Sequence, residues 1–219
     1  MKRTIATSIA ALLAASAAHA DTPAEALWNG GYIGIHAGGA TGDTDVTCVT
    51  GCFSDWGTSV DTNGPFIGAQ LGLNRLVNDR LVVGLEADIS FSDISGDAFF
   101  GGKSASSDLN RFGTARVRAG ILVTPTTMFY ATGGLAWADW TDTFTPESTT
   151  NSFSNVDIGW TVGGGLETFV SDKLSFKIEY LYLDFGDETH SWADSGQSGT
   201  VEFDHQIHTV RLGVNYKLW

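Results

Sequence analysis

The chain contains little proline, little cysteine and little positive charge. Its 219 residues include 4 prolines, 2 cysteines and 12 lysines and arginines, against 25 aspartates and glutamates. The formal charge of −13 argues against nucleic acid as a partner, because phosphate backbones are bound by basic surfaces. After the N-terminus, no apolar run approaches the roughly 20 residues that a membrane-spanning helix needs. If the chain is a membrane protein, it therefore crosses the membrane as strands.

Residues 1–20 have the pattern of a secretory signal peptide. Lys2 and Arg3 form a basic start, residues 5–17 are apolar, and Ala18-His19-Ala20 is an A-x-A cleavage site. We expect removal after Ala20. The two cysteines, Cys48 and Cys52, then lie in an exported segment, where oxidation predicts a local disulfide. No further Cys or His stands nearby at a spacing that a metal site requires.

Eight segments alternate apolar and polar residues with the period of a β-strand. They follow a short polar lead-in, residues 21–30, and we place them at 31–39, 65–74, 81–91, 111–123, 128–140, 156–170, 174–185 and 207–219. We find no convincing amphipathic helix, and the 27 glycines and 11% aromatic residues suit an all-β chain. A segment of ~11 residues at ~3.3 Å per residue, tilted by about 40°, rises roughly 28 Å, which covers the apolar band of a bilayer.

The connections between these segments are alternately long and short. Residues 75–80, 124–127 and 171–173 form short connections, and residues 40–64, 92–110, 141–155 and 186–206 form long ones. Outer-membrane barrels have short periplasmic turns and long external loops, whereas soluble barrels have no reason for this asymmetry. The sequence thus predicts an all-β, eight-stranded antiparallel up-and-down transmembrane β-barrel over residues 31–219, located in the cell outer membrane.

The two faces of the segments agree with this fold. The apolar face carries aromatic residues near both segment ends, which predicts an outer girdle of Phe91, Trp137, Trp160 and Tyr182 and an inner girdle of Phe129, Phe176 and Tyr216. The opposite face carries four acids and four bases: Glu86, Asp88, Arg116, Arg118, Glu167, Lys177, Glu179 and Arg211. Side chains fill the interior of an eight-stranded barrel, so we expect a lumen charge network and no open pore. The alternative is a soluble barrel with its faces reversed, which would have to enclose the large Trp and Tyr side chains.

Several motifs carry a family resemblance. They are Val83-Gly-Leu-Glu-Ala-Asp88, Gly113-Thr-Ala-Arg-Val-Arg-Ala-Gly120, Tyr130-Ala-Thr-Gly-Gly-Leu-Ala136, Gly163-Gly-Gly-Leu-Glu167, Lys177-Ile-Glu-Tyr-Leu-Tyr-Leu-Asp-Phe-Gly186 and Val210-Arg-Leu-Gly-Val-Asn-Tyr-Lys217. Together they resemble the small OmpA-like outer-membrane barrels of alphaproteobacteria, often labelled outer membrane β-barrel domain or porin family proteins. Similar chains typically end Tyr-Lys-Phe. Here Leu218 and Trp219 follow Lys217, so the final aromatic residue is out of phase with the apolar face.

The resemblance implies a structural function without catalysis or cofactor. Members are mostly surface and envelope-integrity proteins, some bind haem, and the family shares no catalytic residues. We expect outer-membrane lipid and lipopolysaccharide as partners, with the barrel assembly machinery contacting the C-terminal strand. An enzyme of the lipid A deacylase kind would need His and Ser two residues apart on a strand. His208 is followed at that distance by Val210 and His36 by Gly38, while His190 and Ser191 are adjacent in a long connection.

Two ligand hypotheses and a small porin-like channel remain as alternatives. His190, His205 and His208, beside Trp192 and Phe203, form a candidate haem patch for a surface-binding module that takes haem or a host or matrix ligand. The long connections, with the charges near them, hold 17 acids and one base, Lys103. This acidity predicts a solvated surface; the alternative is divalent-cation binding among acids such as Asp43, Asp45, Asp184, Asp187 and Glu188, although no Ca²⁺-loop pattern is present.

Overall fold

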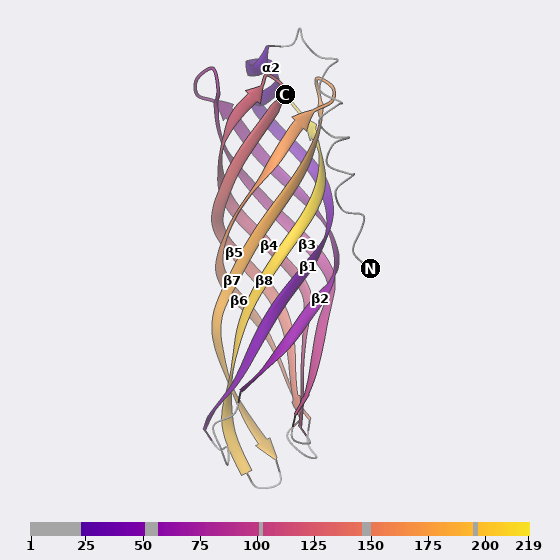
Figure 1. The fold of residues 1–219 in the computed structure, drawn as a ribbon, viewed down its shortest axis with the longest axis vertical. Helices are drawn as coiled ribbons and strands as arrows, with labels where there is room; N and C mark the ends of the chain where they lie inside the picture. Colours follow the sequence, from indigo (N-terminus) through magenta and orange to yellow (C-terminus); the bar gives the residue numbers. More distant parts are fainter. Residues whose placement is uncertain (1–22, 51–56, 101–102, 146–149, 195–196) are drawn as a thin grey trace, which may run out of the picture.

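The chain forms one closed antiparallel barrel. The computed structural model describes residues 23–50, 57–100, 103–145, 150–194 and 197–219. Neighbouring strands pair in chain order and β1 pairs with β8, which closes the barrel (Figure 1). The eight strands are β1 (Gly30–Thr50), β2 (Gly57–Leu76), β3 (Leu81–Phe100), β4 (Lys103–Thr124), β5 (Thr127–Thr145), β6 (Asn151–Phe169), β7 (Leu174–Asp194) and β8 (Gln197–Lys217). The predicted all-β, eight-stranded barrel is confirmed.

The three short connections lie at one end of the barrel, together with the C-terminus (Figure 1). We call this the short-turn end. Between β2 and β3, Asn78 accepts hydrogen bonds from the backbone N–H groups of Arg80 and Leu81 at 3.1 and 2.9 Å, which closes the turn locally. Between β4 and β5 only two residues, Pro125 and Thr126, reverse the chain. The predicted short connections are therefore confirmed in place, and the structure gives them as residues 77–80, 125–126 and 170–173.

The long connections, in contrast, are mostly strand, and the prediction that they are loops is wrong. The ladder between β1 and β2 continues past the expected boundary at Gly39 and Pro65 as far as Thr47 and Gly57. A strand of 20 residues at ~3.3 Å per residue, tilted by about 40°, rises roughly 50 Å, about twice the apolar band of a bilayer. We call the strand parts beyond the outer girdle the distal extension, and the parts between the two girdles the spanning zone.

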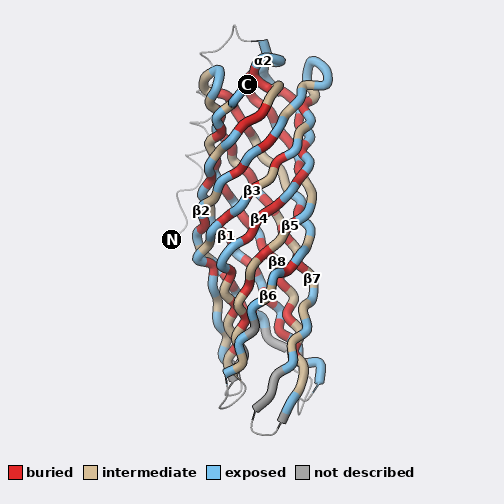
Figure 2. The backbone as a smooth tube through the Cα atoms, turned by 180° about the vertical axis from the view of Figure 1, so that it is seen from behind, coloured by how far each residue is buried: buried red, intermediate tan, exposed pale blue. Residues whose placement is uncertain are grey.

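Side chains alternate between the lumen and the outside along every strand, as Figure 2 shows by its alternating burial. In the spanning zone the outward side chains are apolar and exposed to the surroundings of the barrel, for example Ile35 at 64%, Leu71 at 61% and Val117 at 62%. The outer-girdle residues Phe91 and Trp160 are 56% and 49% exposed. The predicted outward apolar face is confirmed, and the reversed soluble barrel is excluded.

A short helix, α2 (Ala24–Trp28), closes the short-turn end of the lumen. Leu27 and Trp28 are 2% and 1% exposed, so the prediction of a polar lead-in is wrong for this apolar pair. Trp28 donates a hydrogen bond from Nε1 to the carbonyl oxygen of Pro125 at 2.9 Å and packs edge-on against Phe169. Within the described residues, no helix combines the length and the hydropathy needed to cross a bilayer.

Candidate functional site

The lumen of the spanning zone holds a charge network. The structure places all eight charged residues singled out in the sequence in the lumen, between 1% and 8% exposed: Glu86, Asp88, Arg116, Arg118, Glu167, Lys177, Glu179 and Arg211. They come from β3, β4, β6, β7 and β8. Each lies in the lumen because it occupies an inward position of its strand. Buried ions need partners of opposite charge, and the contacts below show how each finds them.

Glu86 and Arg116 lie at the centre of this network. Arg116 donates to Glu86 at 2.5 Å, to Asp88 at 3.1 Å and to Glu179 at 3.1 Å. Lys177 donates to both carboxylate oxygens of Glu86 at 2.8 and 2.9 Å. One guanidinium therefore bridges three carboxylates, which fixes β3, β4 and β7 relative to one another across the lumen.

Two further groups of contacts extend the network towards its ends. Arg211 donates from Nε to Glu179 at 2.5 Å and from Nη2 to Asp88 at 3.3 Å. Arg118 donates to Glu167 at 2.6 Å, and its guanidinium carbon lies 4.1 Å from the ring centroid of Tyr130. The contacts of Arg211 with Asp88 and of Arg118 with Glu167 join residues on non-adjacent strands, so the network ties the barrel across its interior.

Neutral side chains complete the network, and the sequence analysis did not single them out. Tyr32 donates to Glu86 at 2.6 Å and Tyr130 to Glu179 at 2.8 Å. Ser175 and Asn215 donate to Glu167 at 2.6 and 2.8 Å. All four occupy inward positions. The alternation of side chains between the two faces of a strand, here called strand parity, could therefore have identified them as lumen residues. His36 is also buried in the lumen, where its ring contacts Gln70 and, at 2.9 Å, Ser90.

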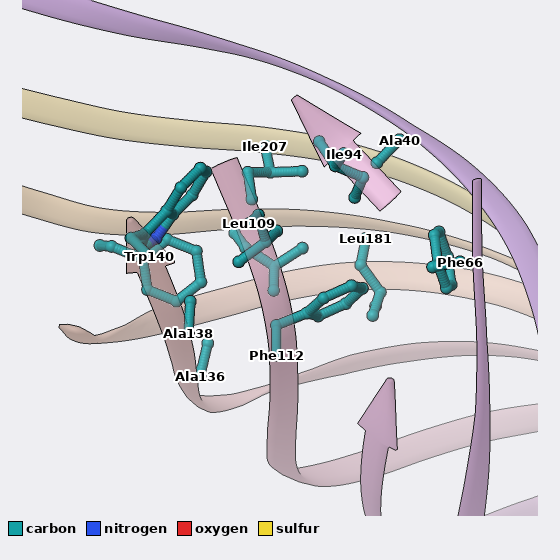
Figure 3. Close-up of a cluster of buried hydrophobic side chains, with 12 residues drawn as sticks. Ala40, Phe66, Ile94, Leu109, Phe112, Ala136, Ala138, Trp140, Leu181 and Ile207 are labelled. Carbon is teal, nitrogen blue, oxygen red and sulfur yellow. The ribbon is translucent and has the colours of Figure 1, made fainter. Parts of the chain in front are cut away.

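An apolar layer fills the lumen on the distal side of the charge network. Figure 3 shows Phe66, Phe112, Leu181 and Trp140 converging with smaller side chains from several strands. The rings of Phe66 and Phe112 lie 5.2 Å apart in an edge-on arrangement. Together with the network and α2, this layer occupies successive levels of the barrel interior with side chains.

A polar layer follows further along the distal extension. His205 is fully buried, stacks on Trp140 at 4.2 Å, and lies 3.1 Å from Thr44 through Nδ1. Its Nε2 lies 3.4 Å from Asp142, which also accepts a hydrogen bond from Ser107 at 2.5 Å. Asp157, on the neighbouring strand β6, has its pKa raised to about 6 by burial and by the nearby acids Glu188 and Asp142, against the opposing effect of His205. The polar layer thus places two acids, Asp142 and Asp157, near one histidine, His205.

Beyond the polar layer the polarity of the barrel is reversed. The inward side chains Val46, Val60, Ala105, Val201 and Phe203 form an apolar cluster and are at most 1% exposed. The outward positions of the same strands carry Asp43, Asp45 and Asp61, all exposed. Asp43 and Asp61 are directly opposite on β1 and β2, and a hydrogen bond between their side chains raises the pKa of Asp43.

The three candidate haem ligands do not form one patch. His205 points into the lumen and is fully buried, whereas His208, three residues along the same strand, is exposed on the outside. An odd separation puts two residues of a strand on opposite faces, so the expected grouping is wrong for a physical reason. His208 instead contacts Tyr180, 2.6 Å from Nδ1 to Oη, and His190 packs against Phe203 with ring centroids 5.8 Å apart.

Two other expectations concern the long hairpins. Cys52, the partner in the predicted disulfide with Cys48, lies outside the described residues, as does the signal peptide. Among the residues that the structure describes, no group of three His, Cys, Asp or Glu side chains is arranged to hold a metal ion.

At the short-turn end of the barrel, the ring of Trp219 lies over Gly31, where a Cβ would come within 2.5 Å of the ring.

The chain belongs to the outer membrane protein beta-barrel domain family, whose model matches residues 8–217. It is 34% identical to the 31 kDa outer-membrane immunogenic protein of Brucella melitensis biotype 1, over 99% of this chain and 100% of that protein. It is 29% identical to the 22 kDa outer membrane protein of Rhizobium leguminosarum bv. viciae, over 86% of this chain and 79% of that protein. The predicted membership of a small alphaproteobacterial barrel family is thus confirmed.

The fold is also similar to a solved outer-membrane barrel. OprG from Pseudomonas aeruginosa superposes with a TM-score of 0.52 at 17% identity, covering 87% of this chain and 97% of that one. The protein is therefore a non-enzymatic outer-membrane β-barrel protein. Since outer-membrane barrels have their short turns in the periplasm, the short-turn end faces the periplasm and the distal extension faces the cell exterior.

Proposed function

We propose that the protein is a structural element of the outer membrane, with a closed lumen and an acidic cell-surface extension, and that it contributes to envelope integrity. The observation that carries this proposal is the charge network, in which Arg116 bridges Glu86, Asp88 and Glu179. A conducting lumen would have to hydrate these ions and break contacts that hold non-adjacent strands together. The apolar layer and α2 add two further barriers along the same axis.

The surroundings of the barrel follow from its outer face. The outward apolar side chains of the spanning zone suit phospholipid and lipopolysaccharide acyl chains. The acidic residues of the distal extension surround the barrel with negative charge, which keeps copies apart and keeps the surface hydrated. The closing strand β8, ending at Lys217, is the segment that we expect the barrel assembly machinery to contact.

Conductance in planar bilayers tests the closed lumen. We expect the purified full-length mature chain to insert without steady single-channel steps, while an open porin studied in parallel conducts. Steady conductance that scales with the number of inserted barrels would refute the closed lumen and favour a small channel.

A deletion strain tests the structural role. We expect loss of the protein to increase leakage of periplasmic enzymes and sensitivity to detergent, and expression of the wild-type chain to restore both. Unchanged leakage and detergent sensitivity in the deletion strain would refute a contribution to envelope integrity.

A further inference from the structure

Among the described residues, β6 and β7 share no ladder contact across their seam beyond the outer girdle. Their ladder ends at Trp160 and Asp184, at the level of the outer girdle. Both strands nevertheless continue: β6 stays paired with β5 back to Asn151, and β7 stays paired with β8 out to Asp194. Within the part of the chain that the structure describes, no ladder contact joins residues 152–159 to residues 185–194. Each strand thus has one backbone edge without a neighbouring strand.

A bulge in β7 separates the two strands. The register of β7 against β8 shifts between Asp184 and Asp187. Gly186, inside the bulge, has a φ of +68°, and its N–H donates to the side chain of Asp184 at 3.1 Å. Just before the bulge the strands touch so closely that a Cβ on Gly159 would lie 1.9 Å from the carbonyl oxygen of Asp184. Bulges bend a strand and end pairing, so the seam opens at this point.

Hydrogen bonds at the far end of β6 show which of its residues face the seam. Phe169, an inward residue, donates its N–H to Thr126 on the β5 side, whereas Val170, the next residue, donates to Leu174 on the β7 side. The alternation continues along β6, because its register against β5 contains no shift. The outward residues therefore direct N–H and C=O groups into the open seam: Ser154, Val156 and Ile158. A row of free backbone groups of this kind is what an added strand pairs with.

The side chains beside the seam define the chemistry of the added strand. Val156 and Ile158 are 59% and 74% exposed, so apolar surface is available next to the free edge. The accessible charged residues beside the seam, Asp187 and Glu188 on β7, are acidic, whereas Asp157 on β6 is buried inside the barrel. A second copy of this chain would bring the same acids, and like charges opposite each other destabilise strand pairing. An extended segment that alternates apolar and basic residues complements both features.

We propose that the open β6 edge of the distal extension binds an extended basic segment of another protein, which adds to β6 as a further strand at the cell surface. The backbone of the segment pairs with Ser154, Val156 and Ile158. Its apolar side chains contact Val156 and Ile158, and its basic side chains contact the acids that flank the seam. The partner is defined by this chemistry alone.

A single edge residue provides the decisive variant. Val156→Pro removes one N–H from the open edge and leaves the β5 ladder its hydrogen bonds, because Val156 does not donate towards β5. Val156→Thr keeps the N–H and serves as the matched control. The probe is a short alternating Lys/Val peptide, compared with an alternating Glu/Val peptide of equal length, added to the full mature chain in detergent micelles. Unchanged heat-modifiable gel migration verifies that both variants fold.

We expect the Lys/Val peptide to bind at about 0.15 M ionic strength, where attraction between exposed charges farther apart than about 8 Å is largely screened and charges in contact still attract. Binding should slow amide exchange at residues 152–159, and Val156→Pro should weaken it by at least about tenfold while Val156→Thr retains it. Three results would overturn the proposal: equal binding to both variants, equal binding of the Glu/Val peptide, or binding without exchange protection on β6. If the chain forms dimers and Val156→Pro dissociates them, the proposal would also be overturned, in favour of strand pairing between two copies of the chain.

Discussion

The spanning zone and the distal extension bury opposite kinds of side chain to the same extent. Lys177 and Arg211 are each 1% exposed inside the spanning zone, and Val46 and Phe203 are 0% exposed inside the distal extension. On the outside, the spanning zone presents apolar residues, and the extension presents acids such as Asp43, Asp45 and Asp61 beside a few apolar residues such as Val156 and Phe99. The same strands, whose side chains alternate between the two faces apart from bulges such as those in β4 and β7, thus suit two different environments. A barrel in lipid holds its ions inside, whereas a barrel in water holds its apolar residues inside.

The comparison also shows where each zone derives its stability. In the spanning zone, lipid lies against the apolar face and the interior is held by ion pairs, so removing one ion leaves a buried opposite charge. In the distal extension, the interior holds the polar layer around His205 and, beyond it, a small apolar cluster that must exclude water by itself, as in a soluble domain. Substitutions of similar size should therefore have very different effects in the two zones.

The largest effect is expected from Arg116→Met. Arg116 contacts three carboxylates and its side chain is 0% exposed, so its loss should destabilise the barrel by about 3–5 kcal/mol. The matched control is Arg111→Met, whose side chain is 53% exposed and, among the described residues, forms an ion pair with Asp139 alone, and which should cost about 0–1 kcal/mol. Urea unfolding in lipid vesicles, followed by tryptophan fluorescence, measures both. Equal effects at the two positions would contradict an ion-bound interior.

The second-largest difference in unfolding free energy between the two zones is expected from a charge placed on the outer face. Val117→Arg places a cation in the spanning zone at a position that is 62% exposed to lipid, and should cost about 2–4 kcal/mol. Ser59→Arg, on the outside of the distal extension, should change the unfolding free energy by less than about 0.5 kcal/mol. The same unfolding assay applies. A large cost at Ser59 would place lipid around the extension and remove the distinction.

A polar group inside the distal extension should have a smaller and local effect. Val60→Thr keeps the shape of a side chain that is 1% exposed but buries a hydroxyl in the apolar cluster, at a cost of about 1–3 kcal/mol. Hydrogen exchange should accelerate at described residues of the extension, such as 59–62, and stay unchanged between the girdles. Uniform acceleration over the whole barrel would show that the two zones unfold as one unit.

The smallest effect concerns pH. Burial raises the pKa of Asp157 to about 6, above its usual value, so the folded chain retains a proton that the unfolded chain releases. This contribution to stability is fully present below about pH 4 and is lost as the pH rises through about 6. Amide exchange in the extension should be more protected at about pH 5 than at about pH 7.5, after correction for intrinsic rates. Asp157→Asn should abolish the difference, and persistence of the full difference in that variant would assign it to another group.

Strand parity explains what could be predicted from the sequence. In the spanning zone the outward positions are apolar over many residues, so the strands, the girdles and the inward placement of Glu86 or Arg211 follow from period-two alternation. The partners within the lumen do not follow from it. Arg118 donates to Glu167, 49 residues away, because barrel tilt and stagger bring β4 and β6 to the same level, and no local pattern encodes that geometry.

The distal extension was missed because its polarity is reversed. A search for apolar residues at outward positions ends at Gly39, although Thr44 and Val46 continue the same alternation with the buried set on the inner face. The same parity separates His205 from His208, which proximity in sequence had grouped. Leu27 and Trp28 were assigned to a polar lead-in because two apolar residues carry no period, and only the open barrel end shows what they cover.

The reversal of polarity at the outer girdle is tested most directly by relaxation measurements in lipid nanodiscs. The line widths of the amide signals along β5 are measured once with a paramagnetic label carried by the lipid tails and once with a paramagnetic label dissolved in water. We predict that lipid-borne broadening extends over residues 129–137 and stops there, and that the water-soluble label broadens residues 141–143. Lipid contact that continues past residue 141, or water contact at residues 131–135, would contradict two zones that meet at the outer girdle.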